Sequence, residues 1–357
     1  MLNNYRNIVI CGYFGFNNAG DELILKTLSE LLKTKFNNFN EKNITVLSNN
    51  PEQTSREYKV NSIKRWNLFV IIFTILNTDI VIFTAGLFQD ITSIISLYYY
   101  LGLIILSKLL NKKVILLGVD FGPIKYKFDK LVLKSILKFV DRIYVRTEGS
   151  YNFLKTNRFL NNTNLKYNIR LGSDILFSKN IEYKPELKTE LANIYLILRR
   201  PDKKNYISNY FNIIELCEQL IKESNIKLVF VPFHIEEDMY FILEIVEKLP
   251  NSVTIMRWNK ADNLFNIISN ADLLISQRLH GLIIGTLLFK PILGISYDPK
   301  LKYFMDEIGL GNYVLPSFSS NKIVFDMIKE IWAEREHIIY KIKQNLPKLQ
   351  SRFNLEL

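Results

Sequence analysis

The chain has 357 residues, which is long for a single hydrophobic core, so two domains are expected. Hydrophobic residues make up 48% of the chain, and this excludes a largely disordered protein. The formal net charge of +11 favours acidic partners such as phosphorylated metabolites or an anionic membrane surface. Nucleic acid is not expected as a partner, because the basic residues are dispersed and no nucleic-acid-binding pattern accompanies them.

The two cysteines and the apolar segments bear on the compartment. Cys11 and Cys217 lie in apolar runs without a CxxC pattern, which predicts buried thiols, a reducing compartment and no zinc site. The opening MLNNYRNIVIC does not resemble a signal peptide, and the apolar runs 68–76 and 94–110 are short for a membrane crossing. We therefore expect a cytoplasmic protein, and peripheral contact with the inner face of the membrane through these two runs stays open.

Strand-like runs alternate with helical runs along the whole chain. In the first half the strand-like runs are 7–11, 44–47, 79–84, 113–118 and 142–146, and in the second half they are 194–199, 227–232, 253–256, 271–276 and 291–296. This alternation predicts an α/β protein with parallel sheets covered by helices on both faces. The polar segment 178–193, which contains Pro185, is the expected linker, and 321–346 is the expected terminal helix. We expect two Rossmann-like domains, residues 1–180 and 190–357, that face a cleft.

Ligands of such sheets bind beyond the carboxyl ends of the strands, so the turns there hold the candidate residues. GYFGFNNAGDELIL, after the first strand, places Gly20 and Asp21 at a helix start, where backbone N–H groups can receive an anion. Its spacing fits neither a dinucleotide fingerprint nor a P-loop, and an ordinary helix start is an equal alternative. In TAGLFQDITS, Gln89 and Asp90 precede a helix, and Asp90 is either an N-cap or a ligand or base for a sugar hydroxyl. Asp120, in GVDFGP, is a weaker candidate.

The second half carries basic side chains at the corresponding positions. Arg199 and Arg200 end one strand, and His234 follows the next. SQRLHGLIIG then places Arg278 and His280 between a buried strand and an apolar helix, where an anion would meet both a guanidinium and helix N–H groups. A histidine there can donate a proton near neutral pH, although an arginine paired with an acid beside a satisfied histidine is an equal alternative. GISYDPK adds Asp298 and Lys300 after the following strand.

Four of these segments, in the same order, resemble the polysaccharide pyruvyltransferases, particularly the bacterial branch that acts in cell-wall and exopolysaccharide assembly. The segments are GYFGFNNAGDELIL, GLFQDITSIISLYYYL, VRTEGS and ISQRLHGLIIGTLLFKPILGISYDPK. The resemblance implies a GT-B-like fold. It also implies transfer of a pyruvyl group from phosphoenolpyruvate to two hydroxyls of one saccharide, free or lipid-linked, as a cyclic ketal. Neither a cofactor nor a metal is implied, since phosphoenolpyruvate is the donor substrate.

The resemblance also implies roles for individual residues. Arg278, Leu279, Arg199 and Lys300 would bind phosphoenolpyruvate, with His280 as general acid toward its carbon 3. On the acceptor side, Asp21 would be the catalytic base, and Gly20, Gln89 and Asp90 would bind the saccharide.

This chain departs from similar sequences at several places. Ala85 replaces a glycine, Asp120 replaces a small residue, Thr147 replaces an acid, and Gly281 replaces an alanine after RLH. Three of these changes lie on the expected acceptor side, which indicates a shifted sugar specificity.

Two other functions stay open at this stage. One is a nucleotide-sugar glycosyltransferase of the same architecture, although the acidic EX7E-type element of many such enzymes is not evident in the second half. The other is a non-catalytic protein that binds a phosphorylated ligand. Neither the acceptor sugar nor the oligomeric state follows from the sequence.

Overall fold

The structure is a computed structural model that describes residues 7–36, 40–91, 93–156, 168–183, 188, 190–201, 206–224, 226–250, 253–317 and 319–353. Contacts divide the chain into two compact units. The first unit contains Met1–Phe16, Asp21–Lys179 and Leu349–Leu357, and the second contains Asn17–Gly20 and Asn180–Lys348. Pro185 of the expected linker lies outside the described residues.

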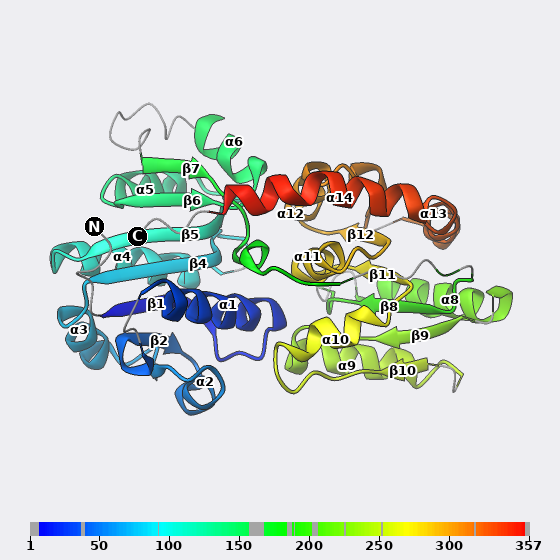
Figure 1. Ribbon diagram of the computed structural model, residues 1–357, viewed down its shortest axis with the longest axis horizontal. Helices are drawn as coiled ribbons and strands as arrows, with labels where there is room; N and C mark the ends of the chain where they lie inside the picture. The colour runs from blue at the N-terminus through cyan, green and yellow to red at the C-terminus, as the bar shows by residue number, and fades with distance from the viewer. Residues whose placement is uncertain are drawn as a thin grey trace. The chain divides into compact units, whose positions relative to one another are not determined.

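The first unit is built on a seven-stranded parallel sheet in the order β3-β2-β1-β4-β5-β6-β7 (Figure 1). Its strands are β1 (Ile8–Phe14), β2 (Ile44–Ser48), β3 (Asn61–Lys64), β4 (Ile80–Phe88), β5 (Lys113–Phe121), β6 (Arg142–Val145) and β7 (Ile169–Leu171). Its helices are α1 (Ala19–Lys35), α2 (Pro51–Tyr58), α3 (Leu68–Leu76), α4 (Ile94–Leu109), α5 (Lys127–Leu137) and α6 (Glu148–Thr156).

Both faces of this sheet are buried, which explains the continuously apolar strand sequences. Successive side chains of a strand point to opposite faces. Val9 and Cys11 of β1 therefore enter the core under α3, α4 and α5, whereas Ile8 and Ile10 enter the core under α1.

The second unit has a six-stranded parallel sheet in the order β10-β9-β8-β11-β12-β13. Its strands are β8 (Asn193–Ile197), β9 (Lys227–Phe230), β10 (Val253–Ile255), β11 (Leu273–Ser276), β12 (Ile292–Ser296) and β13 (Val314–Pro316). Its helices are α8 (Tyr206–Ser224), α9 (Ile235–Val246), α10 (Asn263–Ser269), α11 (Leu279–Leu287), α12 (Pro299–Glu307), α13 (Asn321–Ala333) and α14 (Arg335–Arg352), of which the end from Leu349 onward belongs to the first unit.

The segment expected to form one terminal helix contains two. α13 ends at Ala333, and α14 begins at Arg335. The guanidinium of Arg335 turns back at this point: Nη1 donates to the carbonyl of Trp332 at 2.9 Å, and Nε donates to the carbonyl of Lys188 at 3.1 Å. The first bond satisfies a carbonyl of the last turn of α13, and the second ties the start of α14 to a separate segment, so both stabilise the break.

Two further expectations can be compared with the structure. Cys11 and Cys217 are both buried and unbridged, as expected. Within the described part of the chain, no helix has the length and apolar character needed to cross a membrane.

Candidate active site

Arg278 and His280 lie at the carboxyl edge of the second sheet, where β11 leads into α11. Ser276 ends β11, and its Oγ donates to the carbonyl of Arg278 at 2.7 Å while accepting from the Arg278 N–H at 3.0 Å. A methyl group at Gly281 would collide with this Ser276 side chain, which explains the glycine after RLH in this chain. Arg278 is the N-cap of α11 and provides no side-chain cap to it. The start of α11 therefore offers backbone donors to an anion.

Asp238 of α9 holds Arg278 in place. Oδ1 of Asp238 accepts from Nη2 of Arg278 at 2.6 Å, and the Asp238 side chain is fully buried. Burial alone would lower the pKa of Arg278, but the attraction of Asp238 outweighs it and raises that pKa. The guanidinium thus stays charged, and its buried Nε has no hydrogen-bond partner among the described residues.

The same carboxylate organises two neighbouring strand ends. Its Oδ2 accepts from the N–H of His234 at 2.8 Å, and its Oδ1 accepts from the N–H of Arg200 at 3.2 Å. Arg199 is positioned by Gln277, whose Oε1 accepts from the Arg199 N–H at 2.8 Å. Asp238 and Gln277 thus connect the ends of β8, β9 and β11, and several basic residues gather at one sheet edge.

The imidazole of His280 packs against Gly20, which belongs to the second unit. A methyl group on Gly20 would collide with His280 Nδ1, so only glycine allows this approach. The segment that carries Gly20 is anchored by backbone bonds, from Ala19 N–H to the Phe233 carbonyl at 2.7 Å and from Ile235 N–H to the Asn17 carbonyl at 3.2 Å. The glycine-rich turn after β1 therefore shapes the surroundings of the histidine.

The remaining donor-side residues lie at the same edge. The guanidinium of Arg199 stacks on the ring of Tyr297, 4.4 Å from its centroid. Asp298 caps α12 by accepting from the N–H of Lys300 at 3.0 Å, and the Lys300 ammonium lies 3.7 Å from Asp298 Oδ2. Leu279 is buried in the first turn of α11.

The expected acceptor-side residues of the first unit have diverse surroundings. Asp21 lies in the first turn of α1 and is partly exposed. Asp90 is buried, and its two carboxylate oxygens accept from the backbone N–H groups of Lys125 and Tyr126 at 2.8–3.0 Å. The N-cap of α4 is Ser93 and not Asp90. Gln89 is partly buried at the end of β4, and Thr92 lies outside the described residues.

Asp120 belongs to a buried ionic cluster. Nε of Arg146 donates to Asp120 at 2.5 Å, and Nη1 donates to Asp174 at 2.8 Å. Thr147 and Ser150 also donate their hydroxyls to Asp120, at 3.0 and 2.9 Å. Similar sequences have the acid at position 147 and a small residue at position 120. In this chain the carboxylate is instead that of Asp120, at the end of β5, and it contacts both Arg146 and Thr147.

The structure also reveals an arginine that the sequence analysis did not select. Arg65 follows β3 and is only 3% exposed. Its guanidinium lies 4.7–5.5 Å from the ring centroids of four aromatic residues, which are Phe16, Trp66, Tyr99 and Tyr100. Within the described ranges no carboxylate pairs with Arg65, and its Nε has no partner. Its weak sequence signal was the position directly after a strand, followed by tryptophan.

A family model described as polysaccharide pyruvyl transferase matches residues 18–299, most of the chain and nearly all of the site. The chain belongs to this family. No match was found among curated proteins.

Solved structures support the fold of this family member. The Neisseria meningitidis UDP-GlcNAc 2-epimerase bound to UDP-GlcNAc is 11% identical, with a TM-score of 0.64, and the match covers 97% of each chain. The S. aureus MnaA-UDP structure is 9% identical, with a TM-score of 0.63 and coverage of 95% of this chain and 91% of that chain. A kitacinnamycin glycosyltransferase is 10% identical, with a TM-score of 0.59 and coverage of 98% and 96%. At these identities the similarity shows the fold alone, which is GT-B-like with two Rossmann-like domains, as expected.

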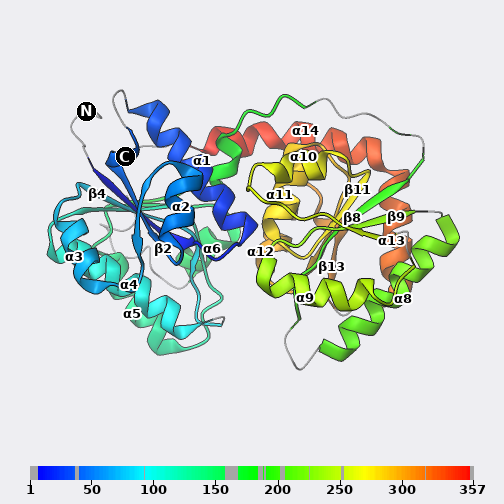
Figure 2. The same cartoon turned by 90° about the horizontal axis from the view of Figure 1, so that it is seen from below.

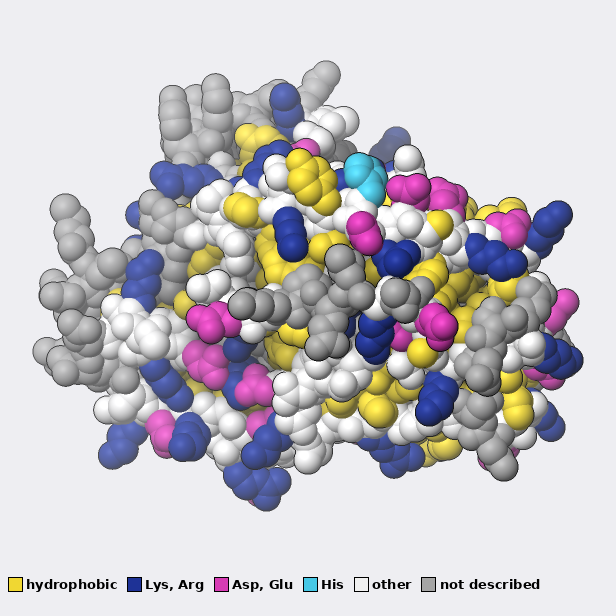
Figure 3. All heavy atoms as spheres, turned by 45° about the vertical axis from the view of Figure 1, so that its right-hand side comes forward, with side chains coloured by type: hydrophobic (Ala, Val, Ile, Leu, Met, Phe, Trp, Pro, Cys, Tyr) yellow, Lys and Arg dark blue, Asp and Glu magenta, His cyan; other side chains and the backbone are white. Residues whose placement is uncertain are grey.

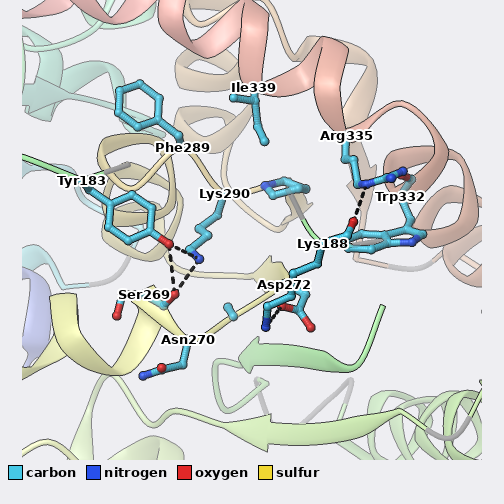
Figure 4. Close-up of a pocket in the computed structure, with 12 residues that line it drawn as sticks. Tyr183, Lys188, Ser269, Asn270, Asp272, Phe289, Lys290, Trp332, Arg335 and Ile339 are labelled. Atoms are coloured by element: carbon cyan, nitrogen blue, oxygen red, sulfur yellow. Dashed lines mark hydrogen bonds and ion pairs between the residues drawn. The ribbon is translucent and has the colours of Figure 1, made fainter. Parts of the chain in front are cut away.

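A cavity of about 120 Å³ lies in the second unit (Figure 4). Neither Arg278 nor His280 lines it. Asp272 and Pro291, which directly precede β11 and β12, line it, so it lies at the amino edge of the sheet. Lys290 points to the hydroxyl of Tyr183 and the carbonyl of Ser269, at 2.7 and 2.6 Å. Lys188 pairs with Asp272 at 2.7 Å. Because these charged groups already have partners within the protein, we assign no ligand to this cavity.

Neither the distribution of surface charge nor a group of metal-binding side chains points to a further binding site among the described residues. On the face shown in Figure 3, the Lys and Arg side chains are scattered among acidic ones. Over the described ranges, no three His, Cys, Asp or Glu side chains are arranged to hold a metal ion.

Proposed function

We propose that this protein transfers the pyruvyl group of phosphoenolpyruvate to two hydroxyls of one saccharide, forming a cyclic ketal and releasing phosphate. The observation that carries the proposal is the placement of Arg278 and His280 at the start of α11. A fixed guanidinium, helix N–H groups and an imidazole meet there, at the carboxyl edge of a parallel sheet. Phosphoenolpyruvate carries a carboxylate and a phosphate, the two anions that guanidinium groups bind best. The reaction as proposed uses no cofactor and no metal ion.

In this proposal the donor is bound entirely by the second unit. Arg278 takes one anionic group, while Arg199, Lys300 and the backbone at Leu279 take the other. Asp238 is buried behind Arg278 and fixes the direction of its guanidinium, so little side-chain entropy is lost when the donor binds.

His280 would be the general acid. It protonates carbon 3 of the enol, so that carbon 2 becomes electrophilic and the first sugar hydroxyl attacks it. The second hydroxyl then displaces phosphate from carbon 2 and closes the ketal. The two hydroxyl protons leave to bases, and Asp21, which directly follows Gly20 in the chain, is proposed as one of them.

We propose that the saccharide, free or lipid-linked, binds to the first unit. Gln89 and Asp90 would contribute there, with Asp90 acting by holding the backbone at Lys125 and Tyr126, and Gly20 would contribute from the start of α1. The aromatic rings around Arg65 add flat apolar surfaces of the kind on which sugar rings stack. A buried cation without a carboxylate partner is costly, so Arg65 favours an acceptor that carries a negative charge.

The test is phosphate release from phosphoenolpyruvate in D2O with a panel of bacterial glycans, followed by mass spectrometry of the products. The proposal predicts glycan-dependent phosphate release and a pyruvate ketal whose methyl group carries solvent deuterium. The variant H280N should lose this activity, whereas H337N, at an exposed histidine of α14, should keep it. Consumption of a UDP-sugar, without any reaction of phosphoenolpyruvate, would contradict the proposal and favour a glycosyltransferase.

A further inference from the structure

We propose that helices α3, α4 and α5 of the first unit form a docking face for an anionic phospholipid membrane. We call the outward sides of these three helices the apolar face. The proposal goes beyond the transfer reaction and does not depend on it.

The apolar face exposes large hydrophobic side chains on each helix. Exposure is 87% for Phe69 and 70% for Phe73 on α3, 74% for both Ile95 and Leu109 on α4, and 67% for Phe128 and 62% for Leu131 on α5. A soluble protein exposes single hydrophobic residues as a rule, but a run of this size across three helices indicates an interaction surface.

The three helices cover the same side of the sheet, so their outward sides belong to one surface. Ile71 of α3, Leu101 of α4 and Leu133 of α5 all pack into the same core cluster with Val9 and Phe83 of the sheet. Figures 1 and 2 show α3, α4 and α5 on this side of the first unit. α3 and α4 are thus apolar toward the sheet and also largely apolar toward solvent, whereas α5 carries lysines beside its outward hydrophobic residues. Helices that are hydrophobic on nearly all sides, as α3 and α4 are, are normally covered on both sides.

The charged residues on these helices indicate that the partner of the apolar face is negatively charged. α3 has no charged residue, and the only charged residue of α4, Lys108, pairs with Asp141 at 2.8 Å. The positive charge of the face therefore comes from Lys127, Lys130 and Lys134 of α5. Their one acid, Asp129, is buried and accepts a hydrogen bond from the Tyr98 hydroxyl at 2.7 Å. Exposed phenylalanine, isoleucine and leucine side chains combined with lysines are the pattern by which surface helices bind anionic lipid.

A second copy of this chain fits less well. A symmetric dimer through this face would bring two identical surfaces together, each with lysines and no exposed acid on its three helices. An anionic bilayer offers complementary charge to the lysines and a hydrocarbon boundary to the phenylalanines. Binding would be peripheral, because no described helix is suited to cross the membrane.

The test is co-sedimentation of the full chain with phosphatidylcholine vesicles that contain or lack phosphatidylglycerol. We expect binding to the anionic vesicles that weakens with salt, and much weaker binding to the neutral ones. The double variant F69S/F73S should bind roughly tenfold less or weaker still, since two large apolar side chains no longer reach the bilayer. A second variant, K127E/K130E, should lose the preference for anionic lipid.

The control is I323S/Y340S, which changes two exposed hydrophobic residues of α13 and α14 in the second unit. It should bind vesicles like the wild type, and circular dichroism should show all variants folded. Absence of vesicle binding, or equal loss in the control, would overturn the proposal. So would a dimer, seen by light scattering, that dissociates in F69S/F73S, because this face would then bind a second copy.

Discussion

Gly20 is the residue through which the turn after β1 controls His280. In G20A the added methyl group must displace the imidazole of His280, because Nδ1 of that imidazole already occupies the space that the methyl group needs. We expect the variant to fold but to have at least about tenfold lower transfer activity, because a misplaced catalytic group accelerates the reaction much less. G102A is the matched control, since a methyl group at Gly102 of α4 meets nothing within 4 Å. The NMR signals of His280 should shift in G20A alone, and unchanged signals with unchanged activity would refute this role of Gly20.

Ala85 holds a backbone conformation that suits glycine. Its φ is 80°, in the left-handed region, and the family resemblance implies a glycine at this position. The left-handed conformation costs a non-glycine residue about 1–2 kcal/mol, and the greater freedom of glycine in the unfolded chain offsets part of this. We expect A85G to raise the free energy of unfolding by up to about 1 kcal/mol, measured by urea denaturation. A271G, at an equally buried alanine outside that region, should lower it instead.

Glu22 makes the stability of the first unit depend on pH. Burial raises the pKa of this carboxyl from 4.5 to about 7, although hydrogen bonds from Tyr58 and Gly15 act in the opposite direction. The pKa in the folded state thus lies above that in the unfolded state. The contribution to stability is therefore fully present below about pH 4.5 and is lost as the pH rises through 7.

Between pH 4.5 and about pH 8 this loss amounts to about 3 kcal/mol. E22Q lacks the ionisation, so its stability relative to the wild type should rise by about that amount over the same range. Urea denaturation at both pH values tests this. A constant difference between the two proteins would show that Glu22 does not titrate in this range.

For single residues, the sequence predicted where on the sheet a side chain lies better than it predicted which side chains it contacts. Arg278, His280 and Lys300 could be placed at one sheet edge because each follows a buried strand. Asp238 could not be identified as the partner of Arg278, because it lies 40 residues away in the sequence. It also stands beside Glu236 and Glu237 in the first turn of α9, where acids are common in any helix. Arg65 was missed because its aromatic neighbours come from separate segments of the first unit.

Two adjacent strand ends, those of β5 and β6, share the buried cluster around Arg146. Burial would lower the pKa of Arg146, but Asp120 and Asp174 reverse this and raise it, so the guanidinium stays charged. D120A should lower the free energy of unfolding by about 3 kcal/mol, since it removes one partner of a buried charge. D120A/T147D returns the acid to the position it has in similar sequences. It should recover part of the loss in urea denaturation, and no recovery would mean that the two positions are not equivalent.

For secondary-structure elements, the sequence predicted those strands that stand out as short apolar runs bounded by polar turns. The five strand-like runs of each half are all strands in the structure. The break between α13 and α14 was not predicted, because it depends on Arg335 bonding to Trp332 and Lys188 and not on a proline or glycine. The apolar runs 68–76 and 94–110 were expected to be too short to cross a membrane, and only the structure shows how much of their surface is exposed.

For the whole molecule, alternating strands and helices were sufficient to predict two Rossmann-like domains, because parallel sheets impose that order. The sequence did not reveal that Asn17–Gly20 packs with the second unit, since this depends on contacts with Phe233 and His280 far along the chain. Family membership supports a transferase that acts on polysaccharide. The identity of the donor is the central claim that needs measurement.

That measurement is thermal unfolding of the purified protein with phosphoenolpyruvate, with UDP-sugars and with phosphate alone, for the wild type and R278A. A ligand present at about 100 times its Kd should stabilise the folded protein by about 2.7 kcal/mol. We expect phosphoenolpyruvate to stabilise the wild type more than phosphate does, and this difference to disappear in R278A and to remain in the control R335A. Stabilisation by a UDP-sugar, without any by phosphoenolpyruvate, would contradict the assignment of phosphoenolpyruvate as the donor.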